Sequence, residues 1–103
     1  MSQRQYEILF IAEQNLGEPE VDTLTATVKG FIEKENGTVE KVEKWGKKRL
    51  AYTIGKNREG SYVLMIANAP GSSISEVERR MRVTDGILRF LAIRIDAEMK
   101  KAD

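Results

Sequence analysis

The chain has 103 residues, of which 41% are hydrophobic, and it carries seventeen Lys and Arg against sixteen Asp and Glu. This length suits one domain with a modest core. The chain contains no Cys and no His, which excludes disulfides, thiolate nucleophiles, imidazole bases and the usual zinc and iron ligands. The composition therefore disfavours an enzyme and predicts no cofactor and no metal site.

The charge is unevenly distributed along the chain. Residues 1–40 carry three basic and eight acidic side chains, whereas residues 41–94 carry twelve basic and five acidic ones. This asymmetry is expected of a protein with one surface facing a polyanion. The opening sequence MSQRQYEILF has no leader-like pattern, and no apolar run is long enough to cross a bilayer. We therefore expect a cytoplasmic protein without membrane contact.

The first half of the chain predicts a strand, a helix and a second strand. Residues 6–11 are rich in β-formers and predict the first strand. Pro19 suits a helix start, Gly37 suits its end, and apolar residues between them recur at helical spacing. The second strand begins near Thr38, with a bulge near Gly46 that restores the alternation of the residues after it. These later apolar residues are Leu50, Tyr52 and Ile54.

The second half predicts a strand, a helix and a last strand. The sequence GKNREG at residues 55–60 predicts a polar turn, so that the next strand, residues 61–68, forms a hairpin with the strand before it. Ser73 and Glu76 have the spacing of a capping box and predict a helix start. A final strand is predicted over residues 87–95.

The order strand, helix, strand, strand, helix, strand is typical of the ferredoxin-like split βαβ plan (βαββαβ), an α+β fold. Its four-stranded antiparallel sheet carries both helices on one face. We expect residues 1–96 to form this single domain and residues 97–103 to form a short, frayed tail.

The face of the sheet without helices is unusually apolar. The segment YVLMIA at residues 62–67 has no polar residue, so apolar side chains must point to both faces of its strand. A sheet that is apolar on both faces needs a second cover, and we predict that a partner protein binds there. Scattered exposed apolar residues are the ordinary alternative. The predicted partner-binding residues are Leu9, Ile11, Tyr62, Leu64, Ile66, Leu91 and Ile93.

No catalytic group is evident in the sequence. Glu18, Glu20 and Asp22 do not have the spacing of a calcium loop, and they suit the first turn of a helix, where the macrodipole stabilises acids.

Basic residues instead cluster around Gly46 and in the last third of the chain, which favours nucleic-acid binding, although such clusters are often only a solvated surface. The aromatic platform of the RNA recognition module is missing, since of its positions only Tyr62 is filled.

Four segments carry a resemblance to a known family. The segments YEILFI, WGKKRLAYTI, YVLMIANAP and MRVTDGILRFLAIR occur in this order along the chain. Together they resemble the bacterial small-subunit ribosomal protein S6 family, except that Thr53 replaces the usual Pro of the second segment. The resemblance implies a ribosome-associated structural protein that binds the central domain of small-subunit ribosomal RNA together with ribosomal protein S18. That partner would cover the apolar sheet face.

The resemblance also implies which residues contact RNA phosphates. Trp45 is expected to be a packing residue, and Tyr52 is expected in the core. A self-associating interaction or regulatory module of the same fold remains the alternative, with no small-molecule substrate in either case. The predicted RNA-binding residues are Arg4, Lys47, Lys48, Arg49, Arg79, Arg82, Arg89 and Arg94.

Overall fold

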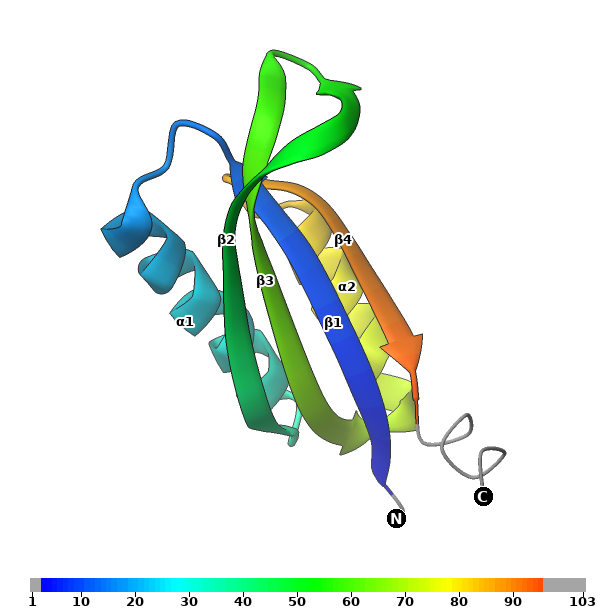
Figure 1. Ribbon diagram of the computed structural model, residues 1–103. Helices are drawn as coiled ribbons and strands as arrows, with labels where there is room; N and C mark the ends of the chain where they lie inside the picture. The colour runs from blue at the N-terminus through cyan, green and yellow to red at the C-terminus, as the bar shows by residue number, and fades with distance from the viewer. Residues whose placement is uncertain (1–2, 96–103) are drawn as a thin grey trace.

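The computed structural model describes residues 3–95 of the chain. Its elements are β1 (Gln3–Glu13), α1 (Glu18–Lys34), β2 (Thr38–Ile54), β3 (Asn57–Pro70), the 3-10 turn η1 (Gly71–Ser73), α2 (Ile74–Arg82) and β4 (Ile87–Arg94). The strands form one antiparallel sheet in the order β2-β3-β1-β4, and both helices lie on the same side of it (Figure 1). The predicted ferredoxin-like fold is confirmed. The predicted tail at residues 97–103 lies outside the described residues.

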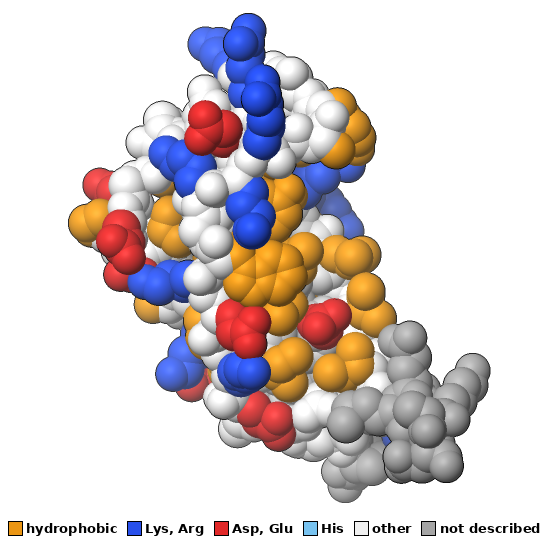
Figure 2. Space-filling model, viewed as in Figure 1, with side chains coloured by type: hydrophobic (Ala, Val, Ile, Leu, Met, Phe, Trp, Pro, Cys, Tyr) orange, Lys and Arg blue, Asp and Glu red, His pale blue; other side chains and the backbone are white. Residues whose placement is uncertain are grey.

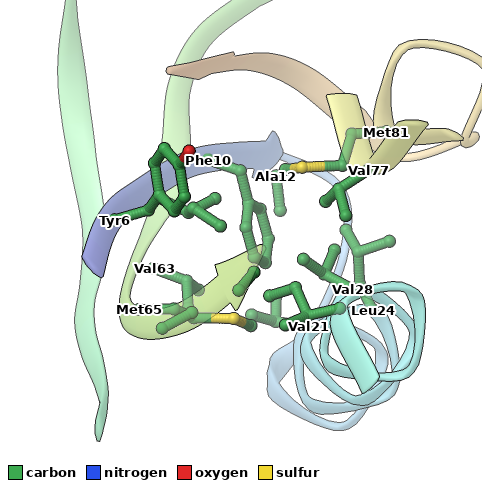
Figure 3. Packing of buried hydrophobic residues seen from close by; sticks show 14 residues of the cluster. Tyr6, Phe10, Ala12, Val21, Leu24, Val28, Val63, Met65, Val77 and Met81 are labelled. Atoms are coloured by element: carbon green, nitrogen blue, oxygen red, sulfur yellow. The ribbon is translucent and has the colours of Figure 1, made fainter. Parts of the chain in front are cut away.

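The core lies between the sheet and the two helices. Burial alternates along β1 from Gln5 and along β3 from Tyr62, so that Ile8 and Phe10 of β1 and Val63 and Met65 of β3 are at most 1% exposed. Figure 3 shows Phe10 among buried side chains from both helices. The helices contribute Val21, Leu24, Val28 and Ile32 from α1 and Val77 and Met81 from α2. These residues recur every three or four positions, as an amphipathic helix requires.

The end of α1 differs from its prediction in one detail. Asn36, and not Gly37, adopts the left-handed conformation, with φ 68°. The Gly37 N–H donates a hydrogen bond to the Ile32 carbonyl at 2.9 Å. A Cβ atom at position 37 would lie 2.7 Å from Ile32 Cγ2 and 2.8 Å from the Asn68 carbonyl oxygen. Gly37 is therefore needed for the close approach of the helix end to β3.

The hairpin between β2 and β3 is tighter than predicted. Only Gly55 and Lys56 separate the two strands, and Gly55 has the positive φ, 58°, that a two-residue turn favours. β3 thus begins four residues before the predicted start at Ser61 and continues to Pro70. The bulge near Gly46 is confirmed by a register shift between Lys44 and Gly46.

The distal part of β2 departs from regular alternation. Of the three register shifts between β2 and β3, the last separates Arg49 from Ile54, and the ladder is interrupted over the residues between them. Leu50 is buried, but Tyr52 is 63% exposed. The prediction that Tyr52 lies in the core is therefore wrong, because the irregularity breaks the alternation from which it was inferred.

The predicted capping box at the start of α2 is also wrong. Ser73 is the last residue of η1 and already has helical angles, φ −94° and ψ −14°. Its hydroxyl donates to the Pro70 carbonyl at 2.8 Å and does not cap α2. Glu76 instead accepts hydrogen bonds from Arg79 and Arg80 one turn further along the helix.

Replacing Gly60 by Ala is expected to destabilise the fold by about 1–3 kcal/mol, because an added methyl group overpacks a full site. A Cβ atom there would clash with the Ile11 side chain and lie 2.9 Å from the Ala12 carbonyl oxygen. Urea unfolding measures the effect. The control is Gly30→Ala, where a Cβ atom meets nothing within 4 Å and helix propensity predicts a gain of about 1 kcal/mol. Equal stabilities of the two variants would contradict this packing argument.

Candidate nucleic-acid and partner interface

The predicted partner-binding residues all lie on the sheet face opposite the helices. Their side chains form rows across the strands, because neighbouring strands place register partners side by side. In one row Leu9 of β1 lies between Leu64 of β3 and Leu91 of β4, and in the next Ile11 lies beside Tyr62. Leu91 is 54% exposed. We call this surface the apolar sheet face; its residues are Trp45 of β2 and the predicted set, Leu9, Ile11, Tyr62, Leu64, Ile66, Leu91 and Ile93.

Trp45 belongs to this face and not to the core. Its ring lies 6.4 Å from the Tyr62 ring, centroid to centroid, with 10° between the planes. The indole N–H donates to Glu43 Oε1 at 3.0 Å, and the residue is 44% exposed. The resemblance implied a packing role for Trp45, and its ring packs on Tyr62, but at the surface. The bulge at Gly46 was the available signal, since a bulge re-aims the side chains beside it.

The hairpin carries the first group of predicted RNA-binding residues. It projects beyond the ends of β1 and β4 (Figure 1) and bears Lys48 and Arg49 on β2, both exposed. Lys56 in the turn and Arg58 on β3 add two cations that the predicted set lacked. Arg49 and Arg58 both line a hollow of about 320 Å³ in the hairpin. Lys47 lies at the base, where its ammonium donates to the Gln14 carbonyl at 2.8 Å.

Two further predicted residues lie beside the hairpin. Arg82 and Arg89 line a hollow of about 330 Å³ together with Ile54 at the end of β2. The guanidinium carbon of Arg89 lies 5.6 Å from the Tyr52 ring centroid, and that of Arg82 lies 5.7 Å from the Phe90 ring centroid. Such contacts hold a guanidinium in place and leave its N–H groups able to bind phosphate.

These cations form one positively charged group, which we call the cationic end. Within residues 3–95, none of them forms an ion pair with a carboxylate. Figure 2 shows Lys and Arg side chains gathered around the hairpin, directly above hydrophobic side chains on the sheet face. The members of the cationic end are Lys48, Arg49, Lys56, Arg58, Arg82 and Arg89.

The remaining predicted RNA-binding residues lie elsewhere. Arg4 is opposite Ala69 and Arg94 is opposite Tyr6, at the end of the sheet away from the hairpin. Arg79 is on α2, where its Nη2 lies 2.6 Å from Glu76 Oε2. The structure therefore does not bring the predicted set together as one site.

Acidic residues in the first two turns of α1 neutralise a lysine of β2. Lys44 Nζ lies 2.5 Å from Asp22 Oδ1 and 3.7 Å from Glu18 Oε2. The hydrogen bond to Asp22 raises the pKa of Lys44 above its ordinary value. Over the described residues, no group of three or more acidic side chains is arranged to hold a metal ion. Lys44 is thus paired with carboxylates, unlike the members of the cationic end.

Glu76 makes the stability of the fold depend on pH in the acid range. The hydrogen bond from Arg79, aided by Arg80, lowers the pKa of Glu76 from 4.5 to about 2. Because the folded pKa is depressed, this contribution to stability is present above pH 4.5 and is lost as the pH falls through 2. In thermal melts between pH 6 and pH 2, we expect Glu76→Gln to lose less stability on acidification than the wild type. Parallel losses in the two proteins would contradict this assignment.

The fold and these two surfaces define a ferredoxin-like protein in which the apolar sheet face lies beside the cationic end. The sequence model of the family described as "Ribosomal protein S6" matches residues 5–94. The chain belongs to the ribosomal protein S6 family, a family of structural proteins of the small ribosomal subunit. It is therefore a ribosome-associated protein, as the resemblance implied.

Named relatives support the same assignment. The chain is 46% identical over 92 residues to small ribosomal subunit protein bS6 of Methylobacterium sp. (strain 4-46), covering 89% of this chain and 69% of the relative. It is 44% identical over 96 residues to the bS6 protein of Bartonella bacilliformis, covering 93% and 71%. Against the bS6 protein of Methylorubrum extorquens (strain PA1), it spans 60% of the relative's length.

A solved structure supports the fold independently. The 30S ribosomal protein S6 of Thermotoga maritima superimposes with a TM-score of 0.87 at 36% sequence identity, covering 97% of this chain and 95% of that one. Among residues 3–95, no helix has the length and apolar character needed to span a membrane.

Proposed function

We propose that this chain is a non-catalytic structural constituent of the small ribosomal subunit that binds the central domain of small-subunit ribosomal RNA together with ribosomal protein S18. In this role it supports assembly of the subunit platform and hence translation. The observation that carries the proposal is the position of the cationic end beside the apolar sheet face, on one side of the molecule (Figure 2).

The cationic end supports the RNA part of the proposal. Exposed Lys and Arg side chains without carboxylate partners are suited to neutralise phosphates and to fix the orientation of the bound RNA. If about four phosphates are contacted, log affinity falls against log salt with a slope of about −3 to −4. Arg4 and Arg94 would add contacts at the other end of the sheet, whereas the ion pair to Glu76 competes with any phosphate at Arg79.

The apolar sheet face supports the proposed binding of ribosomal protein S18. Its rows are mainly aliphatic, and its two aromatic rings, Trp45 and Tyr62, stack on each other. An RNA platform needs several aromatic faces on which successive bases can stack. Apart from Glu7, which lies between Ile66 and Ile93, this surface is largely aliphatic. It therefore matches a protein interface, whose core is depleted of charge.

The direct test is binding of the wild-type chain to a central-domain fragment of small-subunit ribosomal RNA, with S18 present, at several salt concentrations. The expected result is a ternary complex with the slope given above and weaker binding to an unrelated RNA of equal length. Equal affinity for both RNAs would contradict specific recognition. A symmetric dimer formed through the apolar sheet face, with no salt-dependent RNA binding, would support the self-associating module instead.

A further inference from the structure

The hairpin bears four members of the cationic end, and beyond the end of β1 the β3 edge of the hairpin has no neighbouring strand. β1 ends at Glu13, opposite Gly60 of β3, so no third strand flanks the hairpin beyond that point. The β2–β3 ladder itself is interrupted between the pair Arg49–Glu59 and the pair Ile54–Asn57. A projecting hairpin with an interrupted ladder needs another restraint if its cations are to keep one orientation.

Gln14, the first residue after β1, supplies such a restraint. Its side-chain Oε1 accepts hydrogen bonds from the backbone N–H groups of Arg58 at 3.0 Å and Glu59 at 3.4 Å. Its Nε2 donates to the Lys56 carbonyl at 3.4 Å. The side-chain amide thus pairs with two backbone N–H groups of β3 and one carbonyl of the turn. These groups lie at an edge where no neighbouring strand could bind them.

The main chain of Gln14 completes the connection. Its N–H donates to Asn57 Oδ1 at 3.0 Å, and its carbonyl accepts from Lys47 Nζ at 2.8 Å. Asn57 in turn donates through Nδ2 to the Ile54 carbonyl at 3.3 Å. Both strands and the turn of the hairpin are therefore tied to one residue of the loop between β1 and α1.

We propose that Gln14 is a positioning residue for RNA binding, which holds the hairpin so that Lys48 and Arg49 are presented to phosphates in one orientation. This inference rests on the function proposed above. A hairpin that is already ordered loses less conformational freedom on binding, which raises affinity without any added contact. The number of phosphates contacted, and hence the salt slope, does not depend on Gln14.

The test compares Gln14→Ala with the wild type in RNA affinity, with the central-domain fragment and S18 as the probe. The expected loss is about fivefold to tenfold at 0.1 M salt with the slope unchanged. Amide hydrogen exchange at Arg58 and Glu59 is expected to accelerate while exchange at Phe10 in the core does not change. Asn57→Ala, which removes the acceptor of the Gln14 N–H, is also expected to weaken RNA binding.

The matched control is Gln5→Ala. Gln5 lies on β1 and donates to Glu40 Oε1 at 3.0 Å, far along the strand from the hairpin. The Gln5→Ala substitution is expected to leave RNA affinity unchanged. The Lys48→Ala/Arg49→Ala background gives the second control, since Gln14→Ala is expected to cost less than twofold there if it acts through those two cations.

The outcomes separate the two hypotheses. If Lys48→Ala/Arg49→Ala weakens binding but Gln14→Ala binds like the wild type, the role of Gln14 is overturned and the proposed function stands. The role of Gln14 is also overturned if Gln14→Ala weakens RNA binding equally in the wild-type and Lys48→Ala/Arg49→Ala backgrounds. It is likewise overturned if the loss of affinity comes with faster amide exchange at Phe10. In either case Gln14 would be merely structural. If neither change affects binding, the proposed RNA contact fails and the role of Gln14 fails with it.

Discussion

We expect the substitution Leu64→Asp to weaken the binding of ribosomal protein S18 by more than about 100-fold, or about 3 kcal/mol. Leu64 lies in the middle of the apolar sheet face, beside Leu9 of β1. The change removes an apolar contact worth about 1.5–3 kcal/mol and adds a carboxylate that the complex would bury without a partner. Because Leu64 points away from the helices, the fold itself is expected to persist.

Titration calorimetry with purified S18 measures this effect, and circular dichroism checks the fold. Val83→Asp is the control, since Val83 is 72% exposed and follows α2 rather than lying on the sheet. It is expected to leave the affinity within about twofold of the wild type. Wild-type affinity of the Leu64→Asp variant would show that S18 does not use the apolar sheet face.

The double substitution Lys48→Ala/Arg49→Ala is expected to weaken RNA binding strongly. Two lost phosphate contacts reduce the magnitude of the salt slope by about 1.5–2. Since each unit of slope changes affinity tenfold between 0.1 M and 1 M salt, the loss at 0.1 M is roughly 30- to 100-fold. Binding of S18 is expected to be unaffected, because both side chains lie outside the apolar sheet face.

Filter binding to the central-domain fragment at several salt concentrations checks this result. Lys29→Ala/Lys34→Ala is the matched control, because it removes the same charge from α1, on the helical side of the sheet. It is expected to change the slope by less than half a unit. A similar decrease in both variants would mean that net charge, and not the hairpin, determines RNA affinity.

The sequence was sufficient to predict the fold because α1 and α2 have regular helical periodicity and the β-rich runs between them are bounded by clear turn signals. In β1 and β3 the alternation assigns Phe10 and Met65 to the core and Leu9 and Leu64 to the other face, as the structure has them. β2 was harder, because its bulges change which face each later residue occupies. Tyr52 was assigned to the core from the alternation expected along β2, and Trp45 was assigned to a packing position from the family resemblance; both lie at the surface.

The candidate site could be predicted only in part, because charge clusters in sequence do not reveal which cations are already paired. Arg79 and Arg82 are three residues apart on α2, yet Arg79 pairs with Glu76 while Arg82 stacks on Phe90 beside the hairpin. Lys44 belongs to the basic cluster around Gly46 in sequence, but α1 supplies its carboxylate partners. Such pairings depend on tertiary contacts that no local pattern contains.

In the function proposed here, one chain uses two adjacent surfaces, one for a protein and one for RNA, in a single complex. The most direct measurement is the affinity of the wild-type chain for the central-domain fragment with S18 absent and with S18 saturating. The account predicts that S18 tightens RNA binding by about tenfold or more, and that RNA tightens S18 binding by the same factor, since such coupling is reciprocal. RNA affinity that is unchanged by saturating S18 would contradict it.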